Sequence, residues 1–80
     1  MTVELLHTAG CPHVDAARTL LGHCLGALGL ELVVVEREGD YPSPTIVVNG
    51  ADVMGRRELE GAMCRLDLPT RERVLEALAQ

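Results

Sequence analysis

Apolar residues along the first half of the chain follow two different spacings. Short apolar runs over residues 3–7 and 30–36, the second rich in β-branched side chains, predict two strands. Between these runs, apolar residues recur every three or four positions from about Pro12 to Leu28, which predicts an amphipathic helix. Its apolar stripe consists of Ala17, Leu20, Leu21, Cys24, Leu25 and Leu28. A strand, a helix and a strand in this order predict a βαβ unit with parallel strands.

The middle of the chain has the pattern of a β-hairpin. Residues 37–43 are polar and rich in turn formers, so we expect a loop there. Two apolar runs, 44–48 and 51–55, flank the dipeptide Asn49-Gly50. This dipeptide favours a type I′ turn, since both of its positions require a positive φ. We therefore expect two antiparallel strands.

The last third of the chain predicts helices. Leu59, Ala62, Met63 and Leu66 are spaced as on a helix, which predicts a short helix from Arg56 to about Met63. A final helix is expected from about Thr70 to Ala79, with Thr70 as its N-cap and with Val74, Leu75 and Leu78 facing inward. Together the elements predict one α/β domain spanning residues 1–80, built on a four-stranded mixed sheet.

Composition narrows the possible functions. The chain has 80 residues, a net charge of −5, no lysine and one aromatic side chain, Tyr41. A negative charge disfavours binding to nucleic acid or to an anionic membrane surface. No apolar run approaches the ~20 residues that cross a bilayer, and the N-terminus lacks the basic region of a signal peptide. Three cysteines outside any disulfide-framework spacing favour reduced thiols and a cytoplasmic protein.

Cys11 is the main candidate for chemistry. It stands between Gly10 and Pro12, where the first predicted strand gives way to the first predicted helix. Pro12 suits the first helical position, which would make Cys11 the N-cap. Its sulfur would then face the free amides of the first turn, a setting that lowers a cysteine pKa from about 8.5 to ~3.5–7.5. The alternative is that Cys11 is only a small apolar residue in a loop.

The other two cysteines and one histidine have competing interpretations. Cys24 lies on the apolar stripe, roughly 20 Å along the helix from Cys11, which indicates inert packing. Cys64 precedes the helix-breaking segment 67–70, and three roles stay open for it: packing at the sheet edge, a resolving thiol for Cys11, or a second soft-metal ligand. His13 either supports the Cys11 thiolate when protonated, holds a metal with it, or is simply solvated.

The order of elements resembles the thioredoxin/glutaredoxin fold over nearly the whole chain. Cys11-Pro12-His13 is similar to the first half of the glutaredoxin Cys-Pro-x-Cys motif. Ser43-Pro44-Thr45 is similar to the segment that carries the cis-proline of that fold. The resemblance implies that Pro44 is cis and lies against Cys11, and that the Ser43 backbone receives a thiol-bearing ligand. It implies a substrate-binding set of Pro12, His13, Ser43, Pro44 and Thr45.

The chain departs from that family in two respects. The second cysteine of the motif is replaced by Val14, so a disulfide within the motif is impossible, and residues 37–43 leave no room for the usual second helix. The chain is also similar to small thioredoxin-like proteins often labelled organomercurial-lyase-like (alkylmercury-lyase-like). That label implies capture of a soft metal or an organomercurial by thiols.

Three functions are compatible with these observations. In the first, Cys11 is the nucleophile of a thiol–disulfide oxidoreductase, and Cys64 or an external glutathione-like thiol resolves the adduct formed with a thiol-bearing small molecule or a protein disulfide. In the second, Cys11 and Cys64 bind a soft metal such as Hg²⁺ or an organomercurial. In the third, the domain is a non-catalytic interaction module. No resident cofactor is expected.

Overall fold

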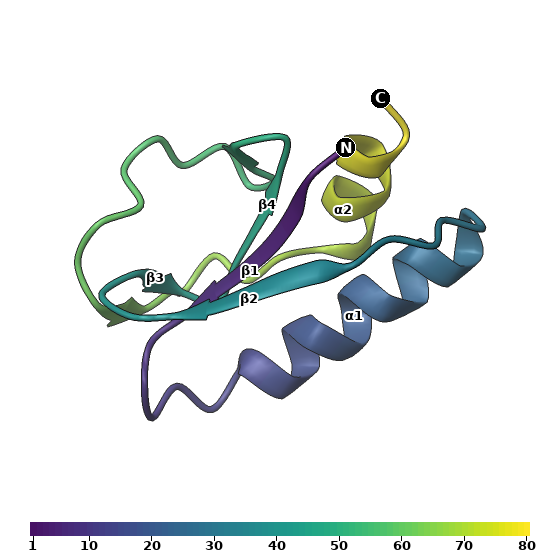
Figure 1. Cartoon of the computed structure of the whole chain (residues 1–80). Coiled ribbons are helices and arrows are strands. Elements are labelled where there is room, and N and C mark those ends of the chain that lie inside the picture. Colours follow the sequence, from purple (N-terminus) through teal and green to yellow (C-terminus); the bar gives the residue numbers. More distant parts are fainter.

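Eight short elements follow one another along the chain in a computed structural model that describes residues 1–80 (Figure 1). In chain order they are β1 (Val3–His7), α1 (Val14–Ala27), β2 (Val34–Glu38), β3 (Pro42–Ser43), β4 (Thr45–Val48), β5 (Ala51–Asp52), β6 (Met63–Cys64) and α2 (Arg71–Leu78). Neither helix is long and apolar enough to cross a membrane.

The main sheet has four strands in the order β2-β1-β4-β5, and a second, two-stranded sheet joins β3 to β6. β1 runs parallel to β2, from the pair Val3 and Val34 to the pair His7 and Glu38. On its other side β1 is antiparallel to β4, where Val3 lies opposite Val48. The expected βαβ unit and four-stranded mixed sheet are therefore confirmed.

The hairpin between β4 and β5 forms at the expected dipeptide. Asn49 has a φ of 51° and Gly50 a φ of 82°, the positive values that a type I′ turn requires. Asn49 also ties the turn to the N-terminus, because its side-chain oxygen accepts a 3.0 Å hydrogen bond from the amide of Thr2. β5 is shorter than expected, because the Asp52 carboxylate accepts from the amides of Met54 and Arg56 and turns the chain away.

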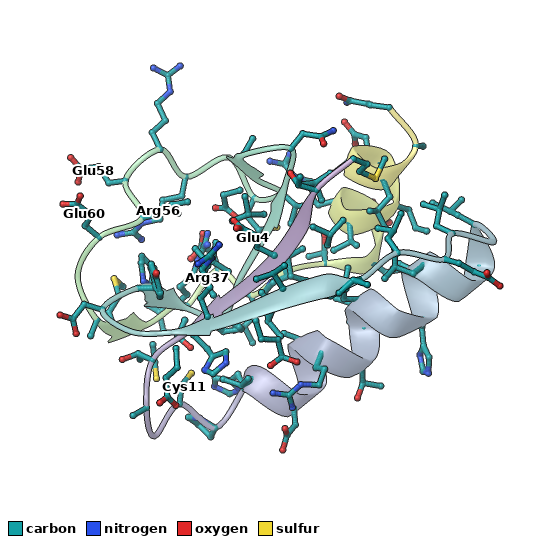
Figure 2. All side chains as sticks on the ribbon, viewed as in Figure 1. Glu4, Cys11, Arg37, Arg56, Glu58 and Glu60 are labelled. Carbon is teal, nitrogen blue, oxygen red and sulfur yellow. The ribbon has the colours of Figure 1, made fainter.

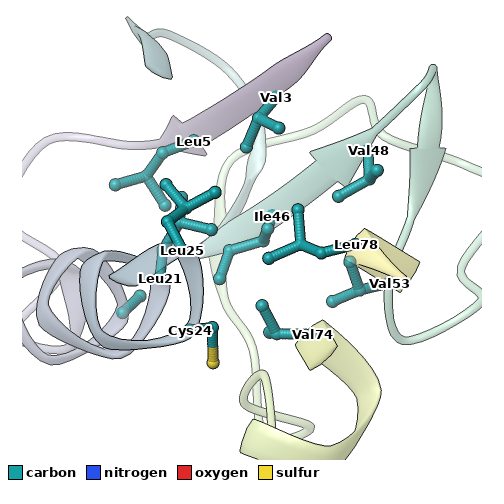
Figure 3. Packing of buried hydrophobic residues seen from close by; sticks show 11 residues of the cluster. Val3, Leu5, Leu21, Cys24, Leu25, Ile46, Val48, Val53, Val74 and Leu78 are labelled. Atoms are coloured by element: carbon teal, nitrogen blue, oxygen red, sulfur yellow. The ribbon is translucent and has the colours of Figure 1, made fainter. Parts of the chain in front are cut away.

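The hydrophobic core lies on one face of the main sheet. Alternate residues of β1 and β4, Val3 with Leu5 and Ile46 with Val48, point to this face, as the two-residue period of a strand requires. Both helices cover it (Figure 3). The helical side chains in the core are Ala17, Leu21, Cys24 and Leu25 of α1 and Val74 and Leu78 of α2. Burying an aliphatic side chain of this size contributes about 1.5–3 kcal/mol.

The predicted apolar stripe of α1 is confirmed for its central residues. Cys24 is completely buried, as expected for a packing residue, whereas Leu20 is only partly buried and Leu28 is 40% exposed. The inward face of α2 is confirmed at Val74 and Leu78, and Leu75 packs against the edge of the core.

Two element boundaries differ from the prediction. α1 begins at Val14 rather than at Pro12, so the expected N-cap at Cys11 is wrong and His13 takes that position. The second strand runs over residues 34–38 instead of 30–36, because β1 begins at Val3 and its first partner is Val34. The polar end of β2 still pairs, since its neighbour β1 continues to His7.

The predicted helix from Arg56 to Met63 is also wrong. Gly55 and Gly61 have φ values of 85° and 93°, outside the right-handed helical region. Leu66, expected on the apolar side of that helix, is 98% exposed. The segment instead crosses in an irregular path to β6, and the last helix then begins after Thr70, whose hydroxyl accepts from the amide of Arg73 at 3.3 Å as predicted.

Candidate functional site

Cys11 lies in the loop between β1 and α1, close to the short strand β3 (Figure 2). Its thiol donates a hydrogen bond to the Ser43 carbonyl oxygen, with 3.6 Å between sulfur and oxygen. The peptide bond from Ser43 to Pro44 is cis, as expected. The loop that carries Cys11 and the segment that precedes β4 therefore meet, although 32 positions separate Cys11 from Ser43.

Cys64 reaches the same place from the other end of the chain. β6 pairs with β3 in parallel, with Cys64 opposite Ser43. The next amide, of Arg65, donates a 2.8 Å hydrogen bond to the same Ser43 carbonyl that accepts from Cys11. Cys11 and Cys64 therefore both lie against Ser43, the first through its thiol and the second as its strand partner. Of the three roles left open for Cys64, the two that require proximity to Cys11 are thus geometrically possible.

The surroundings of Cys11 favour its thiolate. Burial raises the pKa of the thiol, but the Ser43 side chain, the His13 backbone amide and the Cys64 thiol, which can each donate to the thiolate, together outweigh this, so the pKa lies below its ordinary value. Although Cys11 is not the N-cap, its sulfur still faces the amide of the residue that is. The His13 amide is thus one of the groups that lower the pKa of Cys11, after the Ser43 side chain.

Cys64 responds in the opposite direction. Its interaction with the Cys11 sulfur raises its pKa above the ordinary value, with further contributions from burial and from the negative charge of a Cys11 thiolate. Cys64 is exposed, whereas Cys11 is half-buried. Cys11 therefore loses its proton at a lower pH than Cys64 does.

The Ser43 side chain is buried, and its hydroxyl is the one buried side-chain polar group without a hydrogen-bond partner. Leaving a buried hydroxyl unpaired costs about 1–3 kcal/mol, and such groups are rare. The Cys11 thiolate is the group whose pKa this side chain lowers. The hydroxyl is therefore available to donate to Cys11 once the thiol has lost its proton.

The sequence did not indicate a second feature beside the site, the buried side chain of Arg65. Arg65 is 2% exposed and is the only buried residue between Val53 and Val74. Its guanidinium contacts the Asp52 carboxylate at 2.9 Å, the Thr45 hydroxyl at 2.9 Å and both carboxylate oxygens of Asp67 at 3.1 and 2.6 Å. The hydrogen bond from Arg65 holds the pKa of Asp67 below its usual range.

An arginine at this spacing carries no local signal for burial, because arginine is almost always exposed unless it is paired. Its partners come from β4, from β5 and from the residue two positions further along. Only the assembled fold brings these partners to Arg65. The spacing of apolar residues and the sequence motifs therefore could not predict the buried ion pairs.

The remaining predicted substrate-binding residues are divided between the surface and the interior. Pro12 and His13 are exposed beside Cys11. Pro44 is buried and lines a groove of about 140 Å³ together with side chains of α1 and of the chain after β6. The residues that line this groove are His13, Ala16, Ala17, Leu20, Pro44, Leu68 and Pro69.

The structure assigns Thr45 a role different from the expected ligand contact. Thr45 is fully buried, and its hydroxyl donates to the Pro42 carbonyl at 2.6 Å while accepting from Arg65. The carbonyl of Ser43 is likewise engaged within the chain, by Cys11 and by the Arg65 amide. An external ligand thus does not meet a free Ser43 carbonyl, because β6 already occupies that position.

For metal binding, the site offers two thiols. No group of three or more histidine, cysteine or acidic side chains is arranged to hold a metal ion. Cys11 and Cys64 can therefore supply two soft ligands, a set suited to a thiophilic cation and too small for a closed structural zinc site.

Comparison of the chain with models of known protein families, with curated proteins and with solved structures finds no match. The functional interpretation therefore depends on the geometry of Cys11, Ser43, Pro44 and Cys64.

Proposed function

We propose that this protein carries out thiol–disulfide exchange, with Cys11 as the attacking thiolate and Cys64 as the resolving thiol. The observation that carries the proposal is that both cysteines meet at Ser43: the Cys11 thiol donates to its carbonyl, and Cys64 is its partner across β3 and β6. The interaction of the two thiols lowers the pKa of Cys11 and raises that of Cys64. Thiolates are the reactive form of cysteine, so the first attack belongs to Cys11.

The reaction has two exchange steps. The Cys11 thiolate attacks one sulfur of a disulfide R–S–S–R′, which forms a bond from Cys11 to sulfur R and releases R′–S⁻. With Cys11 bound, Cys64 no longer faces a thiolate and loses its proton more readily. The Cys64 thiolate then attacks the Cys11 sulfur, forms the Cys11–Cys64 disulfide and releases R–S⁻. Two protein thiols are oxidised, and one substrate disulfide is reduced to two thiols.

The resemblance to the thioredoxin/glutaredoxin fold supports this assignment. The shared features are a cysteine between a strand and a helix, a cis-proline before the next strand of the sheet, and a βαβ unit followed by a hairpin. In this chain Val14 replaces the second cysteine of the family motif, and Cys64 on β6 supplies the second sulfur. The proposed substrates are therefore a thiol-bearing small molecule or a protein disulfide.

The test is mass spectrometry of the reduced protein after one equivalent of oxidised glutathione, in wild type, Cys11→Ser and Cys64→Ser. We expect an intramolecular disulfide in wild type, a stable glutathione adduct on Cys11 in Cys64→Ser, and no fast reaction in Cys11→Ser. Cys24→Ser is the matched control, because Cys24 is fully buried. It should react as wild type does. A fast reaction that survives in Cys11→Ser contradicts the proposal.

Capture of a soft metal is the second candidate, and the two adjacent thiols without a third ligand favour it. Incubation of the reduced protein with one equivalent of Hg²⁺, followed by native mass spectrometry, distinguishes the two functions. Retention of mercury by wild type but not by either single variant, with no disulfide formed from oxidised glutathione, supports metal capture over exchange.

A further inference from the structure

We infer that Arg65 is a positioning residue that holds Cys64 in attacking range of Cys11. The inference rests on the proposed function, and it concerns the second step alone. Its basis is a contrast in how the chain is held on the two sides of Cys64.

On the side before Cys64 the chain is weakly fixed. All residues from Glu60 to Cys64 are exposed. The backbone hydrogen bonds of this stretch to the rest of the molecule include those from Gly61 to Asp40 at 3.0 Å and from Met63 to Tyr41 at a long 3.4 Å. β6 has only two residues, and the residues before it are exposed, so little buried apolar surface holds this strand in place.

On the other side, one residue makes most of the attachments. The amide of Arg65 donates to the Ser43 carbonyl, which also accepts from Cys11, and its side chain contacts Asp52 and Thr45. The Asp67 carboxylate accepts hydrogen bonds from two nitrogens of the same guanidinium. Because the planar Arg65 guanidinium binds oxygens on several sides, it restricts the backbone of Arg65. Cys64 is the preceding residue, so its position is restricted as well.

The same contacts link the resolving thiol to the main sheet. Asp52 belongs to β5 and Thr45 to β4, two strands of the main sheet. The guanidinium therefore connects the end of β6 to two strands with which β6 does not pair. Removing one partner of a buried ion pair leaves a charge without compensation and is strongly destabilising. The expectation is that weakening this network releases β6 from β3 and carries Cys64 away from Cys11, while the loop that holds Cys11 stays in place.

The experiment separates the two chemical steps. Reduced protein is mixed with oxidised glutathione and quenched with acid at increasing times, and mass spectrometry follows the Cys11 adduct and the intramolecular disulfide. Arg65→Lys keeps the charge but loses the fork, and Asp67→Asn removes the two-nitrogen contact while leaving the buried Arg65–Asp52 pair. Arg37→Lys is the matched control, because Arg37 pairs with Glu4 on the exposed surface, at 3.2 Å, and both residues belong to strands that do not pair with β6.

We expect adduct formation to change less than twofold in all three variants. Resolution should slow at least tenfold in Arg65→Lys and several-fold in Asp67→Asn, so that the adduct accumulates, and should be unchanged in Arg37→Lys. Unchanged resolution in Arg65→Lys overturns the inference. Equal slowing of both steps also overturns it, because a merely structural role would affect both.

A second measurement does not depend on exchange activity. Phenylarsine oxide condenses with two neighbouring thiols, forming two arsenic–sulfur bonds and releasing water, so its retention reports whether Cys64 is within reach of Cys11. Wild type and Arg37→Lys should retain it, and Arg65→Lys should release it at least tenfold faster. If wild type retains the arsenical but forms no disulfide, the proposed function fails and the positioning role stands. Wild-type retention by Arg65→Lys overturns the positioning role.

Discussion

Ser43 supplies two opposite hydrogen-bonding groups to one sulfur. Its carbonyl accepts from the Cys11 thiol at 3.6 Å, whereas its buried hydroxyl has no partner until the sulfur becomes a thiolate. The protonated and deprotonated forms of Cys11 are thus both accommodated by a residue that does not react. This arrangement lowers the pKa of the thiol without any positive charge beside it.

The residue scale predicts the effect of Ser43→Ala. The substitution removes a hydrogen bond that only the thiolate uses, so the pKa of Cys11 should rise and its alkylation by iodoacetamide at neutral pH should slow several-fold. The stability in urea should change by less than about 1 kcal/mol, because the hydroxyl it removes makes no hydrogen bond in the thiol form.

Thr19→Ala, at an exposed position of α1, serves as the control for this substitution. A Ser43→Ala protein with an unchanged pH profile of alkylation would show that the hydroxyl does not assist Cys11. A large loss of stability would show instead that the hydroxyl is paired within the fold.

At the scale of elements, those whose signals lie within a few residues of sequence could be predicted, and those that depend on residues far away in the chain could not. β1, the Asn49-Gly50 turn and the Thr70 cap follow from signals within a few residues, and each was predicted correctly. The start of β2 depends on where its neighbour begins, and sequence reasoning placed it four residues too early.

The candidate site was partly predictable for the same reason. The Cys11 loop has a local signature in the sequence, and the resemblance to the thioredoxin/glutaredoxin fold implied the cis Ser43–Pro44 bond. The approach of Cys64 to Cys11 and the burial of Arg65 depend on β6 pairing with β3, across about twenty residues. Helical spacing in the exposed segment before β6 was misleading, since two glycines with positive φ prevent a helix there.

The Thr70 cap yields an element-scale prediction. Its hydroxyl accepts from the Arg73 amide at the exposed N-terminus of α2, a helix of eight residues that packs Val74 and Leu78 into the core. Thr70→Ala should lower the free energy of unfolding by about 1 kcal/mol, and Thr70→Ser by much less. Urea denaturation followed by circular dichroism measures both, and equal losses in the two variants would contradict the capping role.

On the scale of the whole molecule, the two cysteines of the candidate site are far apart in the chain, at positions 11 and 64. The proposed Cys11–Cys64 disulfide closes a loop of ~50 residues, which in the chain-entropy model stabilises the fold by up to about 4 kcal/mol. Such a loop includes α1 and three of the four main-sheet strands, β2, β4 and β5, whereas β1 precedes Cys11. We therefore expect the proposed disulfide to raise the free energy of unfolding. The effect should be clear in a chain of 80 residues, whose core is small.

This linkage predicts that the oxidised protein unfolds at a higher urea concentration than the reduced protein. The difference should be absent in Cys64→Ser, which cannot close the loop, and present in Cys24→Ser. Size-exclusion chromatography of the oxidised sample ensures that the species compared are monomers. An oxidised form less stable than the reduced form would mean that the fold must distort to join the two sulfurs.

The central claim is that Cys11 and Cys64 interact, so that the pKa of Cys11 lies below that of an ordinary thiol and the pKa of Cys64 above it. The most direct measurement is the rate of iodoacetamide alkylation at each cysteine against pH, resolved by peptide mass spectrometry, in wild type and both single serine variants. The account predicts that Cys11 reacts with a pKa below that of an ordinary thiol and Cys64 with one above it. It also predicts that Cys64 returns toward its ordinary value in Cys11→Ser. Two thiols that titrate independently, each unaffected by replacement of the other, would contradict it.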